Sequence, residues 1–468
     1  MQMYRKVDDK AVTFLRGLFG PDDVLTDPEV KEKYSHDEVP GLRGEPEAVV
    51  RATNAEQVSK LMKFANEEMI PVTPRGAGYG LSGGAVPAFG GIVLSLERMN
   101  RIIEVDKKNL MATVEPGVIT GKIHKAVEAE GLFYPPDPAS LESCSIGGNV
   151  AECAGGPRAV KYGVTKDYVC GLDVVLPSGE IFETGGKLVK NATGYDLRGL
   201  MVGSEGTLGI VTRIVLRLIP LPKVTVDLLV AFKEFQSAAD TVSAIIEQQI
   251  LPTALEFMGR DSLLACEAYL KKELPFSRVA EALLLIKLDG NQKSDVEAMA
   301  AIIGEVCLAH DAIDVLVADN RPDQDRLWEA RRAIIDSLKM RSAINHMEDV
   351  VVPRGRIAEF LAGMKKLQEQ YQYPIVCFGH SGDGNVHVNV LKEDLPDDAW
   401  RRTVPEISAK IFDIALSLGG QITGEHGVGL TRRKHLERAI GPVALRLTRE
   451  IKRVFDPNNI LNPGKILP

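Results

Sequence analysis

Short apolar runs separated by glycine and other turn residues characterise the first half of the chain. Such runs predict β-strands, whereas apolar residues that recur every three or four positions predict helices. On the second criterion, helices are expected at Ala55–Glu68 and Gly121–Gly131. The expected strands are Ile70–Thr73, Ile92–Leu96, Arg101–Val105, Met111–Glu115, Tyr168–Leu176 and Gly209–Leu218.

After Pro220 the pattern changes to alternating strands and helices with few glycines. Strands are expected at Lys223–Phe232, Ala282–Leu288 and Ile313–Val317, with a helix after each of them. This alternation predicts an α+β fold. Because a single hydrophobic core stops growing at about 250–300 residues, the chain of 468 residues is expected to form two domains.

The overall charge and composition exclude several classes of protein. The net charge of −8 argues against a nucleic-acid binder, which would carry a basic face. No apolar run reaches the ~20 residues that span a bilayer, and the N-terminus lacks the apolar centre of a signal peptide. We therefore expect a cytoplasmic protein that contacts a membrane only through a partner. Six cysteines without a C-x-x-C pair indicate reduced thiols and no iron–sulfur cluster.

Three glycine-rich segments, at 74–84, 135–156 and 191–209, are concentrated in the first half. Closely spaced glycines let backbone N–H groups converge on an anion such as a pyrophosphate. A flexible surface loop is the simpler interpretation of any one of them. The first segment is no Walker loop, because no Gly-Lys-Ser/Thr follows it, and its spacing does not fit a Rossmann fingerprint. Three such segments together favour a long, phosphate-bearing ligand.

Histidine is rare, with eight in the chain, yet His380 and His387 lie seven residues apart in a turn-rich segment. Glu425 and His426 follow later. Two imidazoles and a carboxylate can hold a catalytic divalent metal with one coordination position open. In the alternative interpretation, Asp383-Gly384 is a hairpin turn and the histidines are ordinary hydrogen-bonded polar residues.

These motifs occur in an order that resembles the FAD-binding type 4 oxidoreductases, which are related to vanillyl-alcohol oxidase. Within that family the chain is similar to the glycolate oxidase FAD subunit and to D-lactate and D-2-hydroxyglutarate dehydrogenases, from about Pro46 to Lys465. The resemblance implies an FAD-binding domain of the PCMH type at 1–220 and a ferredoxin-like α+β substrate (cap) domain at 221–415. A C-terminal segment, 416–468, is expected to complete the active site and to return to the flavin domain.

The resemblance also implies which residues bind FAD. For the pyrophosphate, the matching positions are Arg75, Gly76, Gly78, Gly80, Ser82 and Gly83. For the isoalloxazine and ribityl regions, they are Pro136, Asp137, Ser140, Gly147, Gly148, Asn149, Ala151, Tyr162 and Gly163. For the adenosine region, they are Glu205, Gly206 and Ile210. Some relatives attach the flavin covalently through a histidine in the first loop; Tyr79 and Gly80 occupy those positions here, so non-covalent FAD is expected.

By the same resemblance, His380, His387 and Glu425 correspond to metal ligands, for zinc, iron or manganese. His426 is the expected general base, because an imidazole with a pKa near ~6.5 suits proton transfer at neutral pH. Asn389 matches a polar residue that lines the same pocket. Arg331 is the candidate for the substrate carboxylate, which a guanidinium can hold with two hydrogen bonds. Without the resemblance it is a helix-surface arginine, and its neighbour Arg332 is the alternative.

The substrate and the electron acceptor follow less directly. Hydroxyglutarate enzymes carry polar residues for a second carboxylate, and Ile335 and Met347 stand at two such places, which favours D-lactate or glycolate. The chain shows no nicotinamide site, haem motif or cysteine cluster. The expected acceptor is therefore a partner, an electron-transferring flavoprotein or an iron–sulfur subunit, with oxygen or a diffusible carrier as alternatives. A D-2-hydroxyglutarate dehydrogenase, an ether-lipid synthase and a non-catalytic flavin electron-transfer subunit are the competing interpretations.

Overall fold

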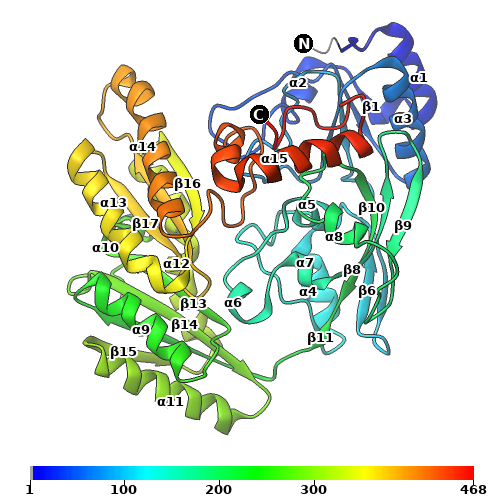
Figure 1. The fold of residues 1–468 in the computed structure, drawn as a ribbon. Coiled ribbons are helices and arrows are strands. Elements are labelled where there is room, and N and C mark those ends of the chain that lie inside the picture. Colours follow the sequence, from blue (N-terminus) through cyan, green and yellow to red (C-terminus); the bar gives the residue numbers. More distant parts are fainter. Residues whose placement is uncertain (1–3) are drawn as a thin grey trace. The chain divides into compact units, whose positions relative to one another are not determined.

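The computed structural model describes residues 4–468, which fold into two compact units (Figure 1). The first unit contains the chain up to Gly155, Val164–Leu221 and His426–Pro468. The second contains Pro222–Glu425 and the short excursion Gly156–Gly163. The domain boundaries expected at 220 and 415 remain a prediction.

The first unit opens with a four-stranded sheet in the order β1-β2-β4-β3, in which β2, β4 and β3 run parallel. Its strands are β1 (Val24–Leu25), β2 (Ala48–Arg51), β3 (Val72–Arg75) and β4 (Ile92–Ser95). The helices on this part are α1 (Asp9–Phe19), α2 (Pro28–Glu32) and α3 (Ala55–Glu68). Helix α3 begins where the Asn54 side chain accepts the N–H of Gln57, a normal N-cap, and it buries one apolar face.

A five-stranded antiparallel sheet in the order β5-β6-β10-β8-β9 completes the first unit, next to a β7–β11 pair. The strands are β5 (Ile102–Asp106), β6 (Met111–Val114), β7 (Leu132–Phe133), β8 (Val169–Val175), β9 (Ile181–Gly185), β10 (Ile210–Arg217) and β11 (Ile219–Pro220). The connecting helices are α4 (Thr120–Glu128), α5 (Ile146–Glu152), α7 (Thr165–Tyr168) and α8 (Leu197–Met201).

Residues His426–Pro468 belong to the first unit, and the preceding residues up to Glu425 belong to the second. After α15 (Leu436–Phe455), the tail pairs with β3: Val72 donates its N–H to the carbonyl of Ile460 at 2.8 Å, and Asn462 donates to the carbonyl of Val72 at 2.7 Å. Ile460 and Leu461 are fully buried in the hydrophobic core of this unit. The tail is thus a structural part of the first sheet.

The second unit is built on one seven-stranded antiparallel sheet, in the order β15-β12-β14-β13-β17-β18-β16. Its strands are β12 (Val224–Phe232), β13 (Ala254–Gly259), β14 (Ala282–Gly290), β15 (Ala312–Ala318), β16 (Asn345–Val351), β17 (Ile375–His380) and β18 (Asn385–Leu391). Together with the helices, this confirms the expected α+β class.

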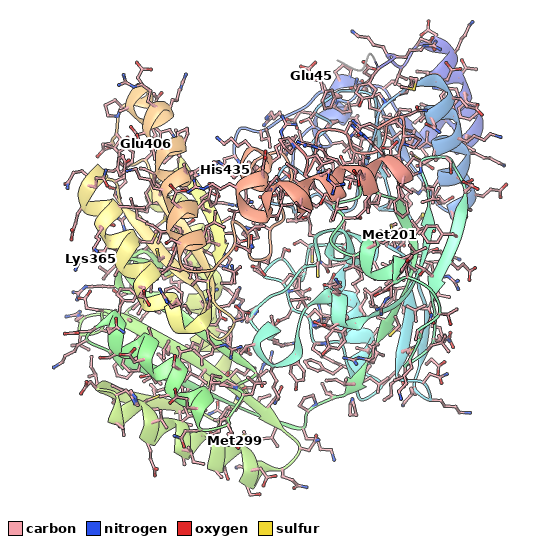
Figure 2. The ribbon with its side chains drawn as sticks, viewed as in Figure 1. Glu45, Met201, Met299, Lys365, Glu406 and His435 are labelled. Carbon is pink, nitrogen blue, oxygen red and sulfur yellow. The ribbon has the colours of Figure 1, made fainter. Side chains whose placement is uncertain are left out.

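Helices cover both faces of this sheet. Helices α10 (Arg260–Leu270) and α12 (Arg321–Arg341) share a hydrophobic core with Met258 and Phe378 of the strands. The helices α9 (Phe235–Glu247), α11 (Lys293–Ala309), α13 (Ile357–Tyr371) and α14 (Asp397–Ser417) pack on the sheet as well. In Figure 2, Lys365 marks α13 and Glu406 marks α14, and both side chains are exposed.

The excursion Gly156–Gly163 carries α6 (Ala159–Tyr162), which packs on β13 and binds Asp289. Lys161 Nζ and Tyr162 Oη both donate to Asp289, at 2.5 and 3.0 Å. Gly156 and Gly163, at its two ends, have φ angles of 124° and 79°, which glycine adopts without strain.

Candidate metal centre and flavin site

The turn-rich segment around the two histidines is a tight β-hairpin. His380 ends β17, and β18 begins at Asn385, directly opposite it. His387 lies two residues further along β18, opposite Phe378. Because alternate residues of a strand share one face, both imidazoles lie on the same face of the sheet, with ring centroids 5.3 Å apart. Asp383-Gly384 does lie in the turn, so the hairpin interpretation and the candidate ligand pair are both compatible with the structure.

Glu425 completes a convergent group with these histidines. Its Oε1 lies 3.6 Å from His380 Nε2 and 3.7 Å from His387 Nε2. A tetrahedral metal with bonds of 2.0–2.1 Å holds its ligand atoms ~3.4 Å apart. Both histidines are buried, and the Glu425 side chain is one-fifth exposed. The donor set, its spacing and its partial access to solvent therefore fit a divalent metal.

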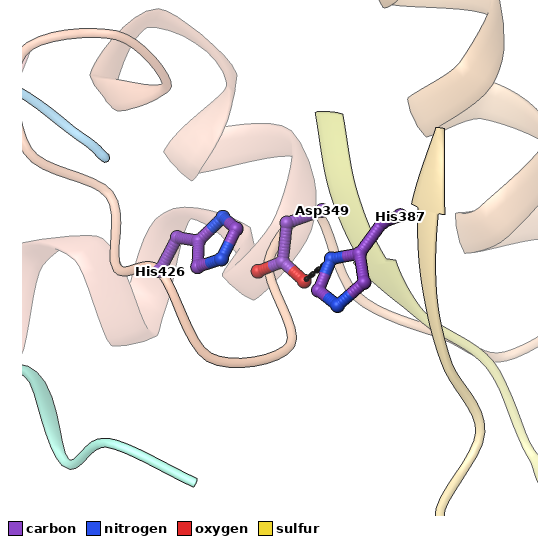
Figure 3. A group of neighbouring side chains, drawn as sticks. All are labelled: Asp349, His387 and His426. Atoms are coloured by element: carbon purple, nitrogen blue, oxygen red, sulfur yellow. Dashed lines mark ion pairs between the residues drawn. The ribbon is translucent and has the colours of Figure 1, made fainter. Parts of the chain in front are cut away.

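Each histidine has a carboxylate behind it. His380 Nδ1 lies 2.7 Å from Glu256 Oε1, and Glu256 sits on β13, directly opposite His380. His387 Nδ1 lies 3.6 Å from Asp349 Oδ1, and this pair also faces across adjacent strands (Figure 3). A carboxylate within hydrogen-bond distance, as Glu256 is from His380, fixes the orientation and tautomer of a metal-binding histidine. Glu256 and Asp349 are both 0% exposed.

Asp349 also ties the hairpin to the loop that carries Glu425. Its Oδ2 accepts the hydroxyl of Thr423 at 3.0 Å and the backbone N–H groups of Gly424 and Glu425 at 2.9 Å each. Its Oδ1 accepts the side-chain amide of Asn385 at 2.6 Å. One buried carboxylate therefore positions the Glu425 backbone relative to the strand of His387.

Arg331 projects from α12 to the same cluster. Its Nε and one Nη each lie 2.8 Å from Glu256 Oε2, and its guanidinium stacks 5.0 Å from the Phe378 ring. Its side chain is 11% exposed. The neighbouring Arg332 is exposed, and its side chain donates to the carbonyl of Asp325 on its own helix. Of the two candidate arginines, Arg331 therefore contacts the cluster through Glu256, and Arg332 is on the exposed side of α12.

Burial and the charge of Glu256 act in opposite directions on the pKa of His380. Burial alone would lower the pKa of His380, but the charges of Glu256 and Glu425 raise it well above its ordinary value. Burial raises the pKa of Glu256, and His380 and Arg331 more than offset this, so the net shift is downward. Burial also raises the pKa of Asp383, in the hairpin turn, to about 6. His380 and Arg331 therefore both favour the ionised form of Glu256.

Asn389 lies on the same face of β18 as His387, with Met347 opposite it on β16. It is buried, and its side-chain nitrogen has no hydrogen-bond partner among the residues that the structure describes. An unused buried donor is costly, which is consistent with a polar ligand nearby. Ile335 lies one helical turn after Arg331 on α12. Met347 therefore neighbours Asn389, whereas Ile335 packs against the hydrophobic core under α12.

The first unit contains a cavity of about 320 Å³ beside the first glycine-rich loop. Gly76, Ala77 and Tyr79 line it together with the cations Lys33, Arg75 and Lys122. The Arg75 guanidinium donates to the carbonyls of His36 and Lys33, and so connects the start of the glycine-rich loop to the segment after α2. A basic cavity beside a glycine-rich backbone fits an anionic group such as the diphosphate of FAD.

The loops around this cavity approach one another closely. A Cβ on Gly76 would lie 2.2 Å from Ser145 Oγ, and one on Gly147 would lie 2.6 Å from Pro116. Ser82 is fully buried, and its hydroxyl has no partner within residues 4–468. The two glycines therefore allow tight packing between the loops, and Ser82 leaves a buried hydroxyl unused.

Several other residues matched to FAD motifs have partners within the protein. Asn149 accepts the Thr120 hydroxyl, the Pro136 carbonyl contacts His124 Nε2, and Tyr162 binds Asp289 in the second unit. Ile210 is buried in the hydrophobic core. Gly78, Gly83, Gly163 and Gly206 have φ angles between 63° and 84°. The remaining matched positions are Gly80, Asp137, Ser140, Gly148 and Ala151. Their roles toward FAD stay predictions.

Glu205 has a distinct structural role in the first unit. Its two carboxylate oxygens accept the backbone N–H groups of Val428 and Gly429, each at 2.7 Å. It therefore fixes the backbone just after His426, the candidate base. Burial raises the pKa of Glu205, although the two N–H groups oppose this. Burial and the charge of Glu205 also raise the pKa of Glu152 well above its ordinary value.

Comparison with known proteins decides the family. Residues 46–185 match the model of the FAD binding domain, and residues 221–466 match that of the FAD linked oxidases, C-terminal domain. The chain belongs to the FAD-linked oxidases. It is 44% identical over 433 residues to the glycolate oxidase subunit GlcD of Bacillus subtilis, covering 92% of this chain and 91% of that protein.

A D-lactate dehydrogenase of Anaerostipes hadrus is 39% identical over 469 residues, with 99% of this chain and 98% of the relative covered. Among solved structures, p-cresol methylhydroxylase with bound substrate matches with a TM-score of 0.80 at 23% identity, over 98% of this chain and 96% of that one. The fold is thus the vanillyl-alcohol-oxidase type, and the protein is an FAD-dependent oxidoreductase. No helix within residues 4–468 has the length and apolar character needed to cross a membrane.

Sequence reasoning missed Glu256 and Asp349. Glu256 is the one acidic residue of an otherwise apolar strand, Ala-Leu-Glu-Phe-Met, and Asp349 follows a second acid, Glu348, in Met-Glu-Asp-Val-Val. A buried charge is costly unless it is paired, so an isolated acidic residue in a core strand is itself a signal. The partners of Glu256 could not be inferred, because His380 lies 124 residues away in the sequence.

Proposed function

We propose that this FAD-linked oxidase is a dehydrogenase of small D-2-hydroxy acids, D-lactate or glycolate, which it converts to the 2-oxo acid. The observation that carries the proposal is the convergence of His380 Nε2 and His387 Nε2 on Glu425 Oε1. Three protein ligands leave coordination positions of a divalent metal open, and an α-hydroxy acid can fill them with its hydroxyl and carboxylate oxygens.

The residues have separate roles in this proposal. When bound, FAD supplies the hydride acceptor, its N5 atom, and the divalent metal held by His380, His387 and Glu425 polarises the substrate hydroxyl. Arg331 binds the substrate carboxylate. His426, next to Glu425 in the chain, takes the hydroxyl proton as the α-hydrogen leaves.

Substrate length is limited by apolar neighbours. Met347 faces Asn389 across adjacent strands, and Ile335 follows Arg331 by one helical turn. Neither side chain can pair with a second carboxylate, which a dicarboxylate such as D-2-hydroxyglutarate would bring. We therefore favour a short substrate, with D-2-hydroxyglutarate as the alternative.

Reduced flavin must pass its electrons on. The cysteines are dispersed through both units, and none is paired within the described residues. We infer that an electron-transferring flavoprotein or an iron–sulfur subunit accepts the electrons. If FAD is bound non-covalently, as Tyr79 and Gly80 lead us to expect, acid precipitation should release it into the supernatant.

Anaerobic bleaching of the oxidised-flavin absorbance tests the proposal directly. D-lactate, L-lactate, glycolate and D-2-hydroxyglutarate are added separately to purified, metal-loaded protein. Rapid bleaching by D-lactate or glycolate, and not by L-lactate, is the expected result. Bleaching mainly by D-2-hydroxyglutarate would overturn the short-substrate proposal. No bleaching by any of the four would favour a non-catalytic electron-transfer subunit.

A further inference from the structure

Glu256 occupies an unusual position between two groups of the proposed site. Its Oε1 lies 2.7 Å from His380 Nδ1, while its Oε2 receives Arg331 Nε and Nη at 2.8 Å. The residue is on β13, a strand that contributes no other polar side chain to the cluster. It is fully buried, so its charge depends on these two partners.

The two contacts constrain both partners. A neutral histidine that donates Nδ1–H to a carboxylate presents the lone pair of Nε2, the atom that faces Glu425 here. An arginine held through Nε and one Nη keeps its guanidinium in one plane, with other N–H groups left to meet a second anion. A single carboxylate thus determines the orientation of a metal ligand and of the candidate substrate-binding arginine.

We propose that Glu256 is a positioning residue that couples metal binding at His380 to substrate-carboxylate binding at Arg331. The inference rests on the proposed function. It adds that one carboxylate orients both the metal ligand His380 and the substrate-binding Arg331. It predicts that one substitution, remote from the substrate itself, weakens both the affinity for metal and the apparent affinity for substrate.

Glu256→Gln is the decisive variant because glutamine has one carbonyl oxygen and one amino group in place of two oxygens. If the amide oxygen faces Arg331, the amino group faces His380 Nδ1 and imposes the tautomer that cannot ligate through Nε2. If the oxygen faces His380, the amino group opposes the N–H groups of Arg331. Either orientation loses one of the two functions, and both lose the charge.

Asp227→Asn is the matched control. Asp227 is a fully buried carboxylate on β12 of the same sheet, paired with Lys287 at 2.9 Å and with the Trp328 indole N–H at 3.0 Å. Within the described structure its side-chain partners are Lys287 and Trp328, and neither His380 nor Arg331 is among them. Asp227→Asn therefore measures the general effect of neutralising a buried acid in this unit. Glu256→Asp keeps the charge and tests whether a carboxylate at this position restores metal affinity.

The measurement is the dissociation constant of the metal, obtained by competition with a chromophoric chelator, with the absorption spectrum of the cobalt(II) form as a second readout. Glu256→Gln should weaken metal binding about 10- to 100-fold, and at saturating metal should raise KM for the hydroxy acid more than it lowers kcat. Glu256→Asp should recover part of the metal affinity. Asp227→Asn should keep the wild-type affinity and cobalt spectrum.

Wild-type metal affinity in Glu256→Gln would overturn the inference, and so would equal losses in Glu256→Gln and Asp227→Asn. A metal defect without a change in KM at saturating metal would refute the coupling. If the wild-type protein itself binds no divalent metal, the proposed function fails at its metal site, an outcome visible before any variant is made.

Discussion

Replacing Asp349 with asparagine should loosen the loop that carries Glu425. Asp349 accepts four hydrogen bonds with donor–acceptor distances of 2.6 to 3.0 Å, three from Thr423–Glu425 and one from Asn385. An asparagine can keep its oxygen toward the loop only by turning its amino group toward the Asn385 amide. One charge-assisted bond is then lost, and a buried donor faces another donor.

The magnitude follows from these contacts. A hydrogen bond to a charged group contributes ~1.5–3 kcal/mol, and a buried donor left without an acceptor costs a further ~1–3 kcal/mol. Asp349→Asn should therefore weaken the closed arrangement by about 3–6 kcal/mol. A free-energy change of 1.4 kcal/mol corresponds to a factor of ten. If the Thr423–Glu425 loop takes up only half of the loss, the protection of its amides should still fall more than tenfold.

Hydrogen exchange measures this locally, which matters because a protein of two units need not unfold in a single transition. In metal-free protein, the amides of Gly424 and Glu425 should lose more than tenfold of their protection in Asp349→Asn. Asp227→Asn is again the control and should leave that peptide unchanged. Unaltered protection of the Gly424–Glu425 peptide in Asp349→Asn would refute the assigned role of Asp349.

Three further predictions concern the proposed carboxylate site and the first unit. Arg331→Lys should raise KM for D-lactate at least tenfold because an ammonium cannot replace the planar fork, and Arg332→Lys should not; equal effects would reject the assignment. Glu205→Ala leaves two buried N–H groups without acceptors and should cost about 2–5 kcal/mol, read as faster limited proteolysis after His426; unchanged cleavage would contradict this. Burial lowers the pKa of Lys465 from 10.5 to about 8, so the unfolded state binds more protons between these values. Stability relative to Lys465→Met should therefore rise from pH 8 to pH 10.5, as measured by urea unfolding, and a flat difference would refute it.

Several helices and strands could be predicted from local sequence signals. The apolar period predicted α3 at its observed ends, because its N-cap and its buried face both lie within a few residues of sequence. The strand expected at Ile70–Thr73 begins instead at Val72, where pairing with β4 and the C-terminal tail sets in. Pairing partners so distant in sequence leave no local pattern, so such boundaries shift by a residue or two.

The candidate site divides in the same way. His380, His387 and Glu425 could be proposed from residue type and resemblance, and the structure brings all three together. The carboxylates behind them could not, because strand order alone makes β13 the neighbour of β17 and β16 the neighbour of β18. The position of Tyr162 was likewise inaccessible, since its partner Asp289 lies 127 residues away.

The pairing of β3 with the tail also bears on how the protein is made. Val72 pairs with Leu461, which is synthesised about 390 residues later, so that edge of the first sheet can be completed only then. At synthesis rates of 5–20 residues per second, the wait lasts roughly 20–80 s. The second unit, whose sheet strands lie between residues 224 and 391, is fully synthesised during that interval. On the ribosome, the inserted unit can therefore fold first, while the unit that begins the chain is the last to close.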